Sequence, residues 1–384
     1  MPKLKVLAAS SGRADIGIIG PVWRAVARDG QMRLDILLTG MHIPDRGAAS
    51  VAALPPDARV HIAGADMGGA GAAAAAAAMA VIQKETAELI AEIEPDILLV
   101  VGDRLDILPV VLATLPFNTP VGHIGGGDLT LGAIDERVRH ALTKLSHVHF
   151  VLNSGAAERI ARMGEETWRI HLIGAPNLDT LVEAPRLSAA EFAAEVGLPN
   201  VLSGIRLVTV HPETNSADPG NILQPILDAL DAVPAPTLIT ASNADPGGEY
   251  INRALLEFVG RRPWAVYRDT LGGRLYANAI RHCALMLGNS SSGIIEAGLF
   301  DMPVINVGSR QEGRLRGSNV HDVAADAAAI AGLLSSLGRE PNRAVAATPY
   351  GDGKAAARIL EILQKLPERS RLLHKQFSIS EWEG

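Results

Sequence analysis

The sequence predicts an α/β protein built from two doubly wound Rossmann-like domains that face each other across a cleft. Three observations predict this fold class. A chain of 384 residues is too long for one ordinary hydrophobic core. Short apolar runs alternate with stretches of helical length and spacing, as in parallel sheets covered on both faces. The alternation is interrupted over 174–198, where Pro176 and Pro185 fall, and then starts again.

The apolar runs of the first half predict strands at 5–9, 33–39, 96–101, 121–124, 149–152 and 169–173. Helical spacing is found at 18–29, 72–93 and 135–145. In the second half the same criteria predict strands at 207–210, 237–240, 265–267, 285–287 and 304–307. Helices are expected between them at 220–232, 250–259, 271–281 and 293–300. We therefore place a first domain at 1–175, a nucleotide-binding domain at 176–366, and a segment at 367–384, ending near Trp382, that packs back on the first domain.

Composition restricts the class of partner and the compartment. A net charge of −7 argues against nucleic acid or an anionic membrane surface as the main partner. The single cysteine, Cys283, lies in an apolar run, so we expect a core residue and neither a disulfide nor a thiolate metal site, as in the cytoplasm. The amino-terminal run Lys3–Ser10 is too short for a signal peptide and predicts a strand. Ala70–Val81 is apolar but small-chained and predicts a packed helix rather than a membrane span.

The stretch Gly102–His140 predicts a site in the first domain. Asp103 and Arg104 follow one strand, and Asp128 follows the next. Because open α/β sheets bind ligands at the carboxyl ends of their strands, we expect these side chains, with His123, in one crevice. Two ordinary polar strand-to-helix loops are the alternative.

In the second domain, Gly288–Gly293 turns through three serines into a helix, an arrangement that suits a diphosphate. A serine N-cap followed by a tight turn is the alternative interpretation. Glu296, about one helical turn later, is placed to accept hydrogen bonds from ribose hydroxyls. Arg310, Arg314 and Arg316 follow another strand end and suit phosphate, although a solvated loop is equally compatible with the pattern.

Three weaker loops occupy similar places, at Ser10–Asp15, His211–Thr214 and Asn243–Gly248. The chain has no G-x-G-x-x-G fingerprint and no Walker A motif, so neither NAD nor ATP is supported. It also has no H-E-x-x-H motif, and His140, His147 and His149 do not have the spacing of a metal site. We expect no cofactor and no metal.

Taken together, these segments resemble the hydrolysing UDP-N-acetylglucosamine 2-epimerases, which supply N-acetylmannosamine-type sugars for sialic and related nonulosonic acids. The resemblance covers nearly the whole chain. It is carried by GRADIG at 12–17, TGMH at 39–42, GDR at 102–104, HIGGGD at 123–128, GAIDERVRHALTKLSHVHF at 132–150, HPET at 211–214, GNSSSGIIEA at 288–297 and RQEGRLR at 310–316.

The resemblance implies the two-domain fold of the B-type glycosyltransferases, a nucleotide sugar between the domains, and no metal or redox cofactor. It implies an anti elimination of UDP through a 2-acetamidoglucal, followed by addition of water. By resemblance, Asp103 and Asp135 are the catalytic carboxylates. The groups implied to hold the nucleotide and its phosphates are Arg13, Arg104, His211, Asn243, Ser290, Ser291, Glu296, Arg310 and Arg314.

The chain departs from the family at two positions. Sialic-acid members have a catalytic glutamate at the third residue of the HIxGG motif, where this chain has Gly125; Asp128 is the candidate to replace it. A tyrosine common in the family is Ile16 here. Both changes suggest a modified substrate, such as a 4-acetamido or 6-deoxy sugar, or a GDP carrier in place of UDP.

Two other functions fit the same motifs. One is a B-type glycosyltransferase, which would pass the sugar to an acceptor. The other is a catalytically impaired nucleotide-sugar-binding protein, which the glycine at position 125 motivates. For any of them we expect a homo-oligomer, either a dimer or a tetramer.

Overall fold

The computed structural model describes residues 3–43, 51, 54–66, 71–129, 134–198, 203–213, 221–243, 245–337 and 348–378, with only the backbone of Arg13 and Ala14. The chain divides into two compact units. The first comprises Met1–Asp179 and Gly353–Gly384, and the second comprises Thr180–Asp352. The chain thus leaves the first unit once and returns to it near Gly353. Trp382 lies outside the described residues.

The first unit contains a seven-stranded sheet in the order β3-β2-β1-β4-β5-β6-β7, and every described pairing in it is parallel. Neighbouring strands β1 and β4 are the point where the strand order reverses, which is where doubly wound sheets bind ligands. The strands are β1 (Leu4–Ser10), β2 (Met32–Leu38), β3 (Arg59–Ile62), β4 (Ile97–Val101), β5 (Val121–Ile124), β6 (Val148–Val151) and β7 (Ile170–Leu172).

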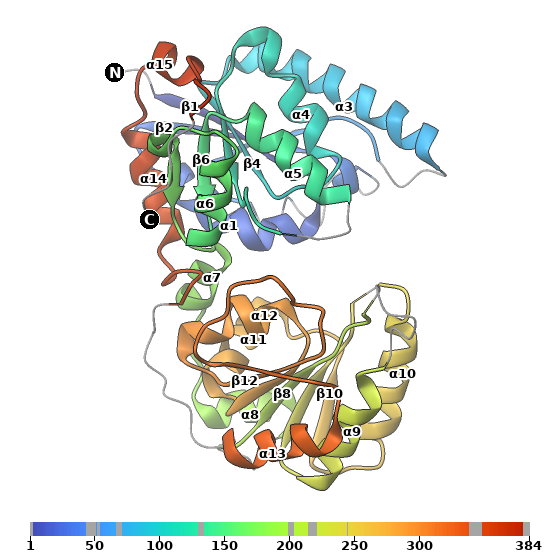
Figure 1. The fold of residues 1–384 in the computed structure, drawn as a ribbon. Helices are drawn as coiled ribbons and strands as arrows, with labels where there is room; N and C mark the ends of the chain where they lie inside the picture. Colours follow the sequence, from blue (N-terminus) through green and yellow to red (C-terminus); the bar gives the residue numbers. More distant parts are fainter. Residues whose placement is uncertain are drawn as a thin grey trace. The chain divides into compact units, whose positions relative to one another are not determined.

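Helices cover both faces of this sheet (Figure 1). One apolar core joins the sheet to α1 and α14, with Trp23 fully buried in it; the other joins it to α3, α4 and α5. The helices are α1 (Arg13–Arg28), α3 (Ala72–Ile93), α4 (Ile107–Leu112), α5 (Ile134–Leu145), α6 (Ser154–Arg162), α7 (Asn177–Glu183), α14 (Ala355–Gln364) and α15 (Arg369–Leu373). Short 3₁₀ helices are η1 (Gly40–His42), η2 (Leu115–Phe117) and η3 (Thr167–Arg169).

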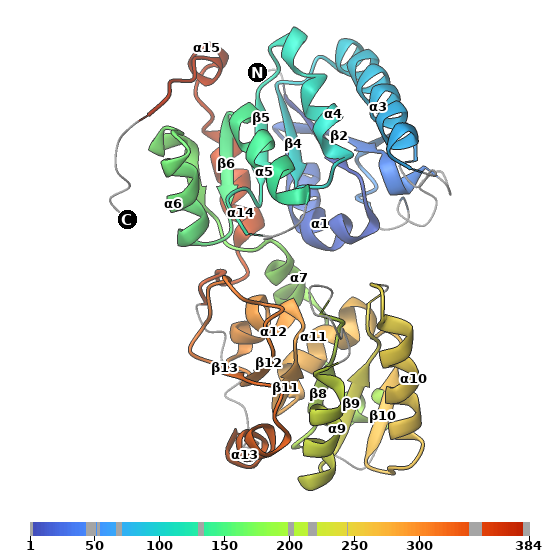
Figure 2. The ribbon, with the colours of Figure 1, turned by 45° about the vertical axis from the view of Figure 1, so that its right-hand side comes forward.

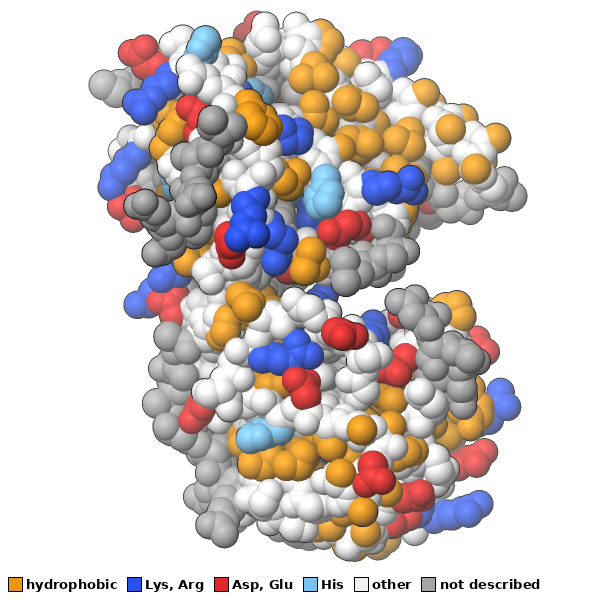
Figure 3. Space-filling view, in the orientation of Figure 1, with side chains coloured by type: hydrophobic (Ala, Val, Ile, Leu, Met, Phe, Trp, Pro, Cys, Tyr) orange, Lys and Arg blue, Asp and Glu red, His pale blue; other side chains and the backbone are white. Residues whose placement is uncertain are grey.

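Helix α3 is the long alanine-rich segment of the sequence. Its second half buries Leu89, Ile90 and Ile93, whereas most alanines of its first half are exposed. Figure 3 shows the resulting apolar surface over this helix. No helix in the described part of the chain is long and apolar enough to cross a membrane.

The second unit repeats the arrangement with a six-stranded sheet in the order β10-β9-β8-β11-β12-β13, again parallel in every described pairing. Its strands are β8 (Arg206–Thr209), β9 (Thr237–Thr240), β10 (Ala265–Arg268), β11 (Leu285–Gly288), β12 (Val304–Val307) and β13 (Val320–Val323). Its helices are α8 (Ala189–Val196), α9 (Leu223–Ala232), α10 (Gly248–Val259), α11 (Gly272–His282), α12 (Ser291–Ile295), η4 (Ala297–Phe300) and α13 (Ala327–Leu337). Helices α9, α10 and α13 share one core with the strands (Figure 2), and the order reverses between β8 and β11.

Two carboxylates fix the returning chain on the first unit. Asp179 of α7 accepts hydrogen bonds from the N–H groups of Ala355 (3.0 Å) and Ala356 (2.7 Å) at the start of α14. Farther on, Lys375 donates to Glu165 (2.7 Å), a side chain without solvent exposure. Because these contacts satisfy groups that burial would otherwise leave unpaired, they hold the last described residues against the sheet.

Candidate active site

Three loops meet at the strand ends where the first sheet reverses its order. Gly12, after β1, lies beneath the Arg104 side chain, since a Cβ atom there would be 3.6 Å from the arginine Cδ. Gly40, after β2, adopts a φ of +57° and touches Asp106, so that a Cβ atom would collide with its carboxylate. Glycine at position 40 therefore permits the loop after β2 to pack closely on the loops after β1 and β4, whereas a Cβ atom at position 12 would make only ordinary contact.

Arg104 is held in an acidic surrounding. It donates to the buried Asp106 through Nε and Nη2, both at 3.2 Å. Burial opposes its charge, but Asp106, Asp15 and Asp135 together raise the pKa of the Arg104 guanidinium above its usual value. The arginine thus connects the ends of β1 and β4 with the first turn of α5.

Asp103 and Asp135 are electrostatic neighbours at this place. Burial and then the charge of Asp103 raise the pKa of the Asp135 carboxyl, while Arg139 and Arg104 oppose that rise. Arg139, 2% exposed, donates to Asp103 and also to Glu136 at 2.7 Å. One carboxylate therefore has a guanidinium partner, and the other is biased toward its protonated form, as in pairs that divide base and acid roles.

The glycine loop after β5 is fixed by two arginines. Arg139 donates to the carbonyl of Asp128, and Arg159 of α6 donates to that of Gly127. Asp128 is thus joined to the carboxylate pair through its backbone, and its half-buried side chain has no hydrogen-bond partner in the described part of the chain.

His123 lies beside the predicted crevice, close enough to Asp103 and Arg139 for their charges to act on it, but it is buried beneath the loops. Its side chain is fully buried, its Nε2 lies 2.7 Å from the carbonyl of Gly102, and burial lowers its pKa to about 4. The reason is the alternation of side chains along β5, which turns this residue into the interior beneath the loops.

The loop after β1 is internally satisfied. Asp15 accepts hydrogen bonds from the N–H groups of Ser11 (3.1 Å) and Gly12 (2.9 Å) and from the Ser10 hydroxyl (3.1 Å). His42 approaches the same hydroxyl at 3.0 Å. Burial nevertheless raises the pKa of Asp15. The predicted ligand group Arg13 begins α1, but its side chain lies outside the described residues.

The second unit gathers a separate set of groups at its own reversal point. The Asn289 side chain accepts from the backbone N–H of His211 (2.8 Å) and donates to its carbonyl (2.8 Å). His211 Nδ1 accepts from the N–H of Asn243 at 3.1 Å. Burial and the charge of Arg310 lower the pKa of His211 to about 4, so the imidazole is neutral near pH 7. Thr214 and Ala244 of these loops lie outside the described residues.

The serine turn is partly a helix cap. Ser290 caps the five-residue helix α12, accepting from the N–H of Ser292 at 3.4 Å and sharing a 2.8 Å bond with its hydroxyl. Ser291 is half-exposed at the first helical position. Glu296 accepts from the Tyr276 hydroxyl at 2.7 Å, and burial with this carboxylate raises the pKa of that tyrosine well above its usual value.

Arg310 and Arg314 form the cationic part of the second set. Burial and the positive charge of Arg314 lower the pKa of Arg310, although Asp245 lies 3.7 Å from its guanidinium. Within the described residues, Nη1 of Arg314 is buried without a hydrogen-bond partner. Two neighbouring guanidiniums, one with an unpartnered buried donor, suit a bound anion.

The sequence analysis missed several of these groups. Arg139 follows Asp135 by four positions, a spacing that places both on one face of a helix and could have been recognised. Asp106 lies only two positions after its partner Arg104 and could have been noted beside the GDR motif. Asn289 lies inside a motif already noted, but its partner, His211, is 78 positions away and could not be foreseen. No group of three or more His, Cys, Asp or Glu that could hold a metal ion occurs among the residues that the structure describes.

Comparison with known proteins gives one consistent family. A sequence profile described as UDP-N-acetylglucosamine 2-epimerase matches residues 24–364. The UDP-N,N'-diacetylbacillosamine 2-epimerase (hydrolyzing) of Legionella pneumophila is 32% identical over 97% of this chain and 98% of its own length. The GDP/UDP-N,N'-diacetylbacillosamine 2-epimerase (hydrolyzing) of Campylobacter jejuni is 30% identical over 84% of this chain and 85% of its own.

Solved structures confirm the predicted fold class. The UDP-GlcNAc 2-epimerase of Neisseria meningitidis, crystallised with UDP-GlcNAc, superposes with a TM-score of 0.74 at 18% identity, over 94% of this chain and 100% of that one. A putative UDP-N-acetylglucosamine 2-epimerase from Listeria monocytogenes gives a TM-score of 0.75, also at 18% identity, over 96% and 98% of the two chains.

Proposed function

Because the chain belongs to the UDP-N-acetylglucosamine 2-epimerase family and is an enzyme of that family, we propose that it is a hydrolysing 2-epimerase of a nucleotide-linked 2-acetamido sugar. The sugar is released as the free 2-epimer, an N-acetylmannosamine-type product, together with the nucleoside diphosphate.

The proposed substrate carries acetamido groups at C2 and C4, as in N,N'-diacetylbacillosamine. Two relatives that are at least 30% identical are named for that sugar. Gly125, in place of a family glutamate, also favours a sugar that differs from UDP-N-acetylglucosamine. The preferred carrier is UDP, with GDP as the second choice because the Campylobacter relative is named for both. The product would then enter synthesis of a nonulosonic acid of the legionaminic or sialic type.

The observation that carries the proposal is the unequal pair Asp103 and Asp135. Asp103 has the Arg139 guanidinium as its partner, whereas burial and the charge of Asp103 raise the pKa of Asp135. Elimination across C1 and C2 needs a base for the C2 proton, and addition to the glucal needs an acid that returns a proton to C2. We assign the base to Asp103 and the acid to Asp135. Asp128 is the further carboxylate available to orient the water.

In the proposed reaction, a carboxylate takes the C2 proton while the C1–O bond breaks, the C1–C2 double bond forms and UDP leaves. Water then adds its oxygen to C1 as one of its protons passes to a carboxylate, and C2 receives a proton from Asp135 on the opposite face. The leaving diphosphate gains negative charge as it departs, so cations near it lower the barrier. Arg310 and Arg314 are the groups to which we assign this task, supported by the unpartnered donor of Arg314. His211, Asn243, Ser290, Ser291, Glu296, Arg13 and Arg104 are proposed to bind the rest of the nucleotide sugar.

Incubation in deuterated water tests the reaction. Given UDP-N,N'-diacetylbacillosamine or UDP-N-acetylglucosamine, a hydrolysing epimerase releases UDP and a free sugar with deuterium at C2. A glycosyltransferase without an acceptor leaves the substrate intact, and a protein that only binds shows saturable binding without release. A released sugar that retains hydrogen at C2 would contradict proton abstraction. The homo-oligomer and the cytoplasmic location stay predictions; sedimentation at two protein concentrations checks the first.

A further inference from the structure

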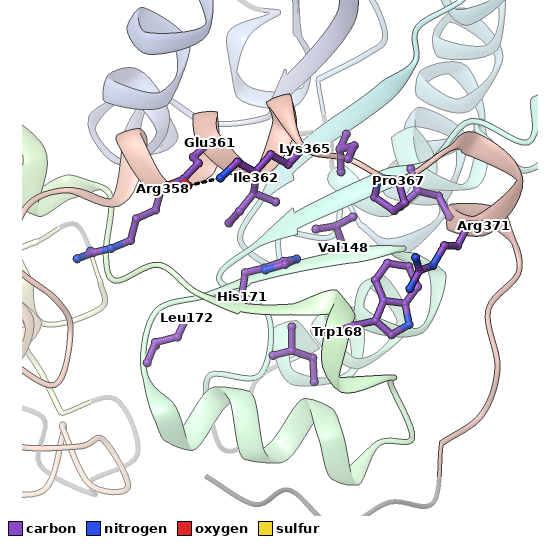
Figure 4. Close-up of a pocket in the computed structure, with 13 residues that line it drawn as sticks. Val148, Trp168, His171, Leu172, Arg358, Glu361, Ile362, Lys365, Pro367 and Arg371 are labelled. Carbon is purple, nitrogen blue, oxygen red and sulfur yellow. Dashed lines mark hydrogen bonds and ion pairs between the residues drawn. The ribbon is translucent and has the colours of Figure 1, made fainter.

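A second concave site lies in the first unit and is lined by different residues from those of the carboxylate site. It has a volume of about 620 Å³, within the range of small-molecule sites. Its walls come from the edge strand β7, from β6 and η3, and from the returning helices α14 and α15. Figure 4 shows His171 projecting from β7 toward Ile362 of α14, with Val148 close by.

The lining combines an apolar floor with excess positive charge. Val148, Ile362 and Leu372 supply apolar surface. Three cations line the pocket, Arg358, Lys365 and Arg371, against one carboxylate, Glu361. That carboxylate is bonded to Lys365, but both side chains are largely exposed (63% and 71%), so the pair is weak.

Arg371 is presented to the pocket by an aromatic ring. Its guanidinium carbon lies 4.9 Å from the centre of the Trp168 ring, and Figure 4 shows the two side chains side by side at one end of the pocket. No carboxylate pairs with Arg371 in the described part of the chain. Stacking on an indole restricts a guanidinium while leaving its edge able to donate to an anion.

The pocket lies between the two chain segments that connect the first unit to the second. Its two walls are the segments through which the chain passes between the units: β7 leads into α7, and α14 follows the return. Arg358 of α14 donates to the carbonyl of Ile173, directly after β7, at 3.0 Å. Asp179 of α7 binds the first N–H groups of α14. A ligand between these walls therefore contacts both crossing segments at once.

We propose that this pocket binds a small organic anion with an apolar face, and that its occupancy holds β7 and α14 more tightly together. The charged group is taken by Arg371, which is stacked on Trp168, and the apolar face rests on Val148 and Ile362. The inference is independent of the proposed epimerase reaction, because binding and amide exchange can be measured without turnover.

Benzoate and its neutral analogue benzamide are suitable probes of the full chain, with binding followed by ligand-observed NMR. Because a charge-assisted hydrogen bond contributes about 1.5–3 kcal/mol, benzoate should bind at least about ten-fold more tightly. In the double variant Lys365→Gln/Arg371→Gln this preference should disappear. The matched double variant Lys84→Gln/Arg162→Gln removes cations that are 75% and 76% exposed elsewhere on the unit and should retain it. The proposal would be overturned if the full chain bound benzoate and benzamide with equal affinity. It would also be overturned if both double variants reduced the preference for benzoate to the same extent.

A cavity-filling variant locates the ligand without altering the cations. His171→Trp should abolish benzoate binding while leaving the urea unfolding transition of the first unit in place, which reports that the unit that contains the pocket is folded. Hydrogen exchange then tests the link to the crossing segments. Benzoate, but not benzamide, should slow exchange of the Ala355 and Ala356 amides several-fold. Binding that persists in His171→Trp, or exchange that does not respond, would contradict the proposal.

Discussion

Arg139 donates to the carboxylate of Asp103, two residues beyond the end of β4. The arginine lies one helical turn after Asp135, whose pKa the same Asp103 raises. The buried guanidinium of Arg139 therefore orients the Asp103 carboxylate, and its positive charge opposes the rise that Asp103 causes in the pKa of Asp135. It also holds the carbonyl of Asp128, so that all three acidic residues depend on its position.

Replacing Arg139 should affect turnover more than nucleotide binding. In Arg139→Met, Asp103 loses its counter-charge and its orientation, and we expect kcat to fall at least about hundred-fold, or about 3 kcal/mol of barrier. Arg139→Lys should recover part of this loss, because lysine restores the positive charge but cannot donate through two separate nitrogens as the guanidinium does. UDP affinity should stay within a few-fold, because most of the groups proposed to bind the nucleotide, Arg310 and Arg314 among them, lie in the second unit.

The matched control for that experiment is Arg137→Met, two positions away on the exposed side of α5. It should retain turnover. Steady-state kinetics and UDP titration of the three variants check the prediction. The prediction would be contradicted if kcat fell as far in Arg137→Met, or if UDP affinity fell as far as kcat in Arg139→Met. Either result would mean that Arg139 supports the folded structure in general rather than the carboxylates.

The two arginines of the second unit should determine UDP affinity. In Arg314→Gln and in Arg310→Gln we expect about ten-fold weaker binding each, because each variant removes a charge-assisted bond to phosphate. Arg316→Gln is the control: that guanidinium already donates to Asp322 at 2.6 Å. Calorimetric titration with UDP measures all three. Unchanged affinity in Arg314→Gln would mean that its unpartnered donor does not face the nucleotide.

Most strands could be predicted from the sequence, including the edge strands β7 and β10, but the edge strands β3 and β13 could not. The expected segments 121–124, 237–240 and 304–307 match β5, β9 and β12, because each lies inside its sheet and is almost wholly buried. β3 and β13 were missed: as edge strands they are half-exposed and carry polar residues such as His61 and Asp322. Helix α8 lies inside the expected linker, where its apolar residues, Phe192 among them, pack in the second unit.

The site was predictable to the extent that it depends on strand ends. Asp103, Arg104 and Asp135 are brought together as expected because β4 and α5 follow a regular α/β order. The partner of the Asp103 carboxylate, Arg139, lies within α5, and its contact depends on which face of that helix it occupies rather than on a strand end. The pocket beside Trp168 was not foreseeable, since its walls come from residues about 200 positions apart and form only when the chain returns.

Glu165 should make stability depend on acid pH. Although burial opposes it, hydrogen bonds from His149, Lys144 and Lys375 lower the pKa of Glu165 to about 2, from an ordinary value of 4.5. Its contribution to stability is therefore complete above pH 4.5 and is lost as pH falls toward 2, because the unfolded chain binds the proton first. In Glu165→Gln, the unfolding free energy should be lower at neutral pH and should change less between those limits. Urea unfolding at several pH values tests this, with the more exposed Glu158→Gln as control.

The last prediction separates two glycines of the loop after β5. Gly125 and Gly127 both have a left-handed φ, +86° and +75°, so alanine costs about 1–2 kcal/mol at either from backbone strain alone. Their surroundings differ. A Cβ atom at Gly125 would have only the Gly102 nitrogen within 4 Å, at 3.9 Å, whereas at Gly127 it would collide with the carbonyl of Ala156. Gly125→Ala should therefore lose about 1–2 kcal/mol and keep its turnover. Gly127→Ala should lose a further ~1–3 kcal/mol, from the steric conflict, with turnover falling as Asp128 moves. Urea unfolding and steady-state kinetics measure the stability and the turnover of each variant. Equal destabilisation of the two variants would show that a Cβ atom at position 125 is not free of steric conflict.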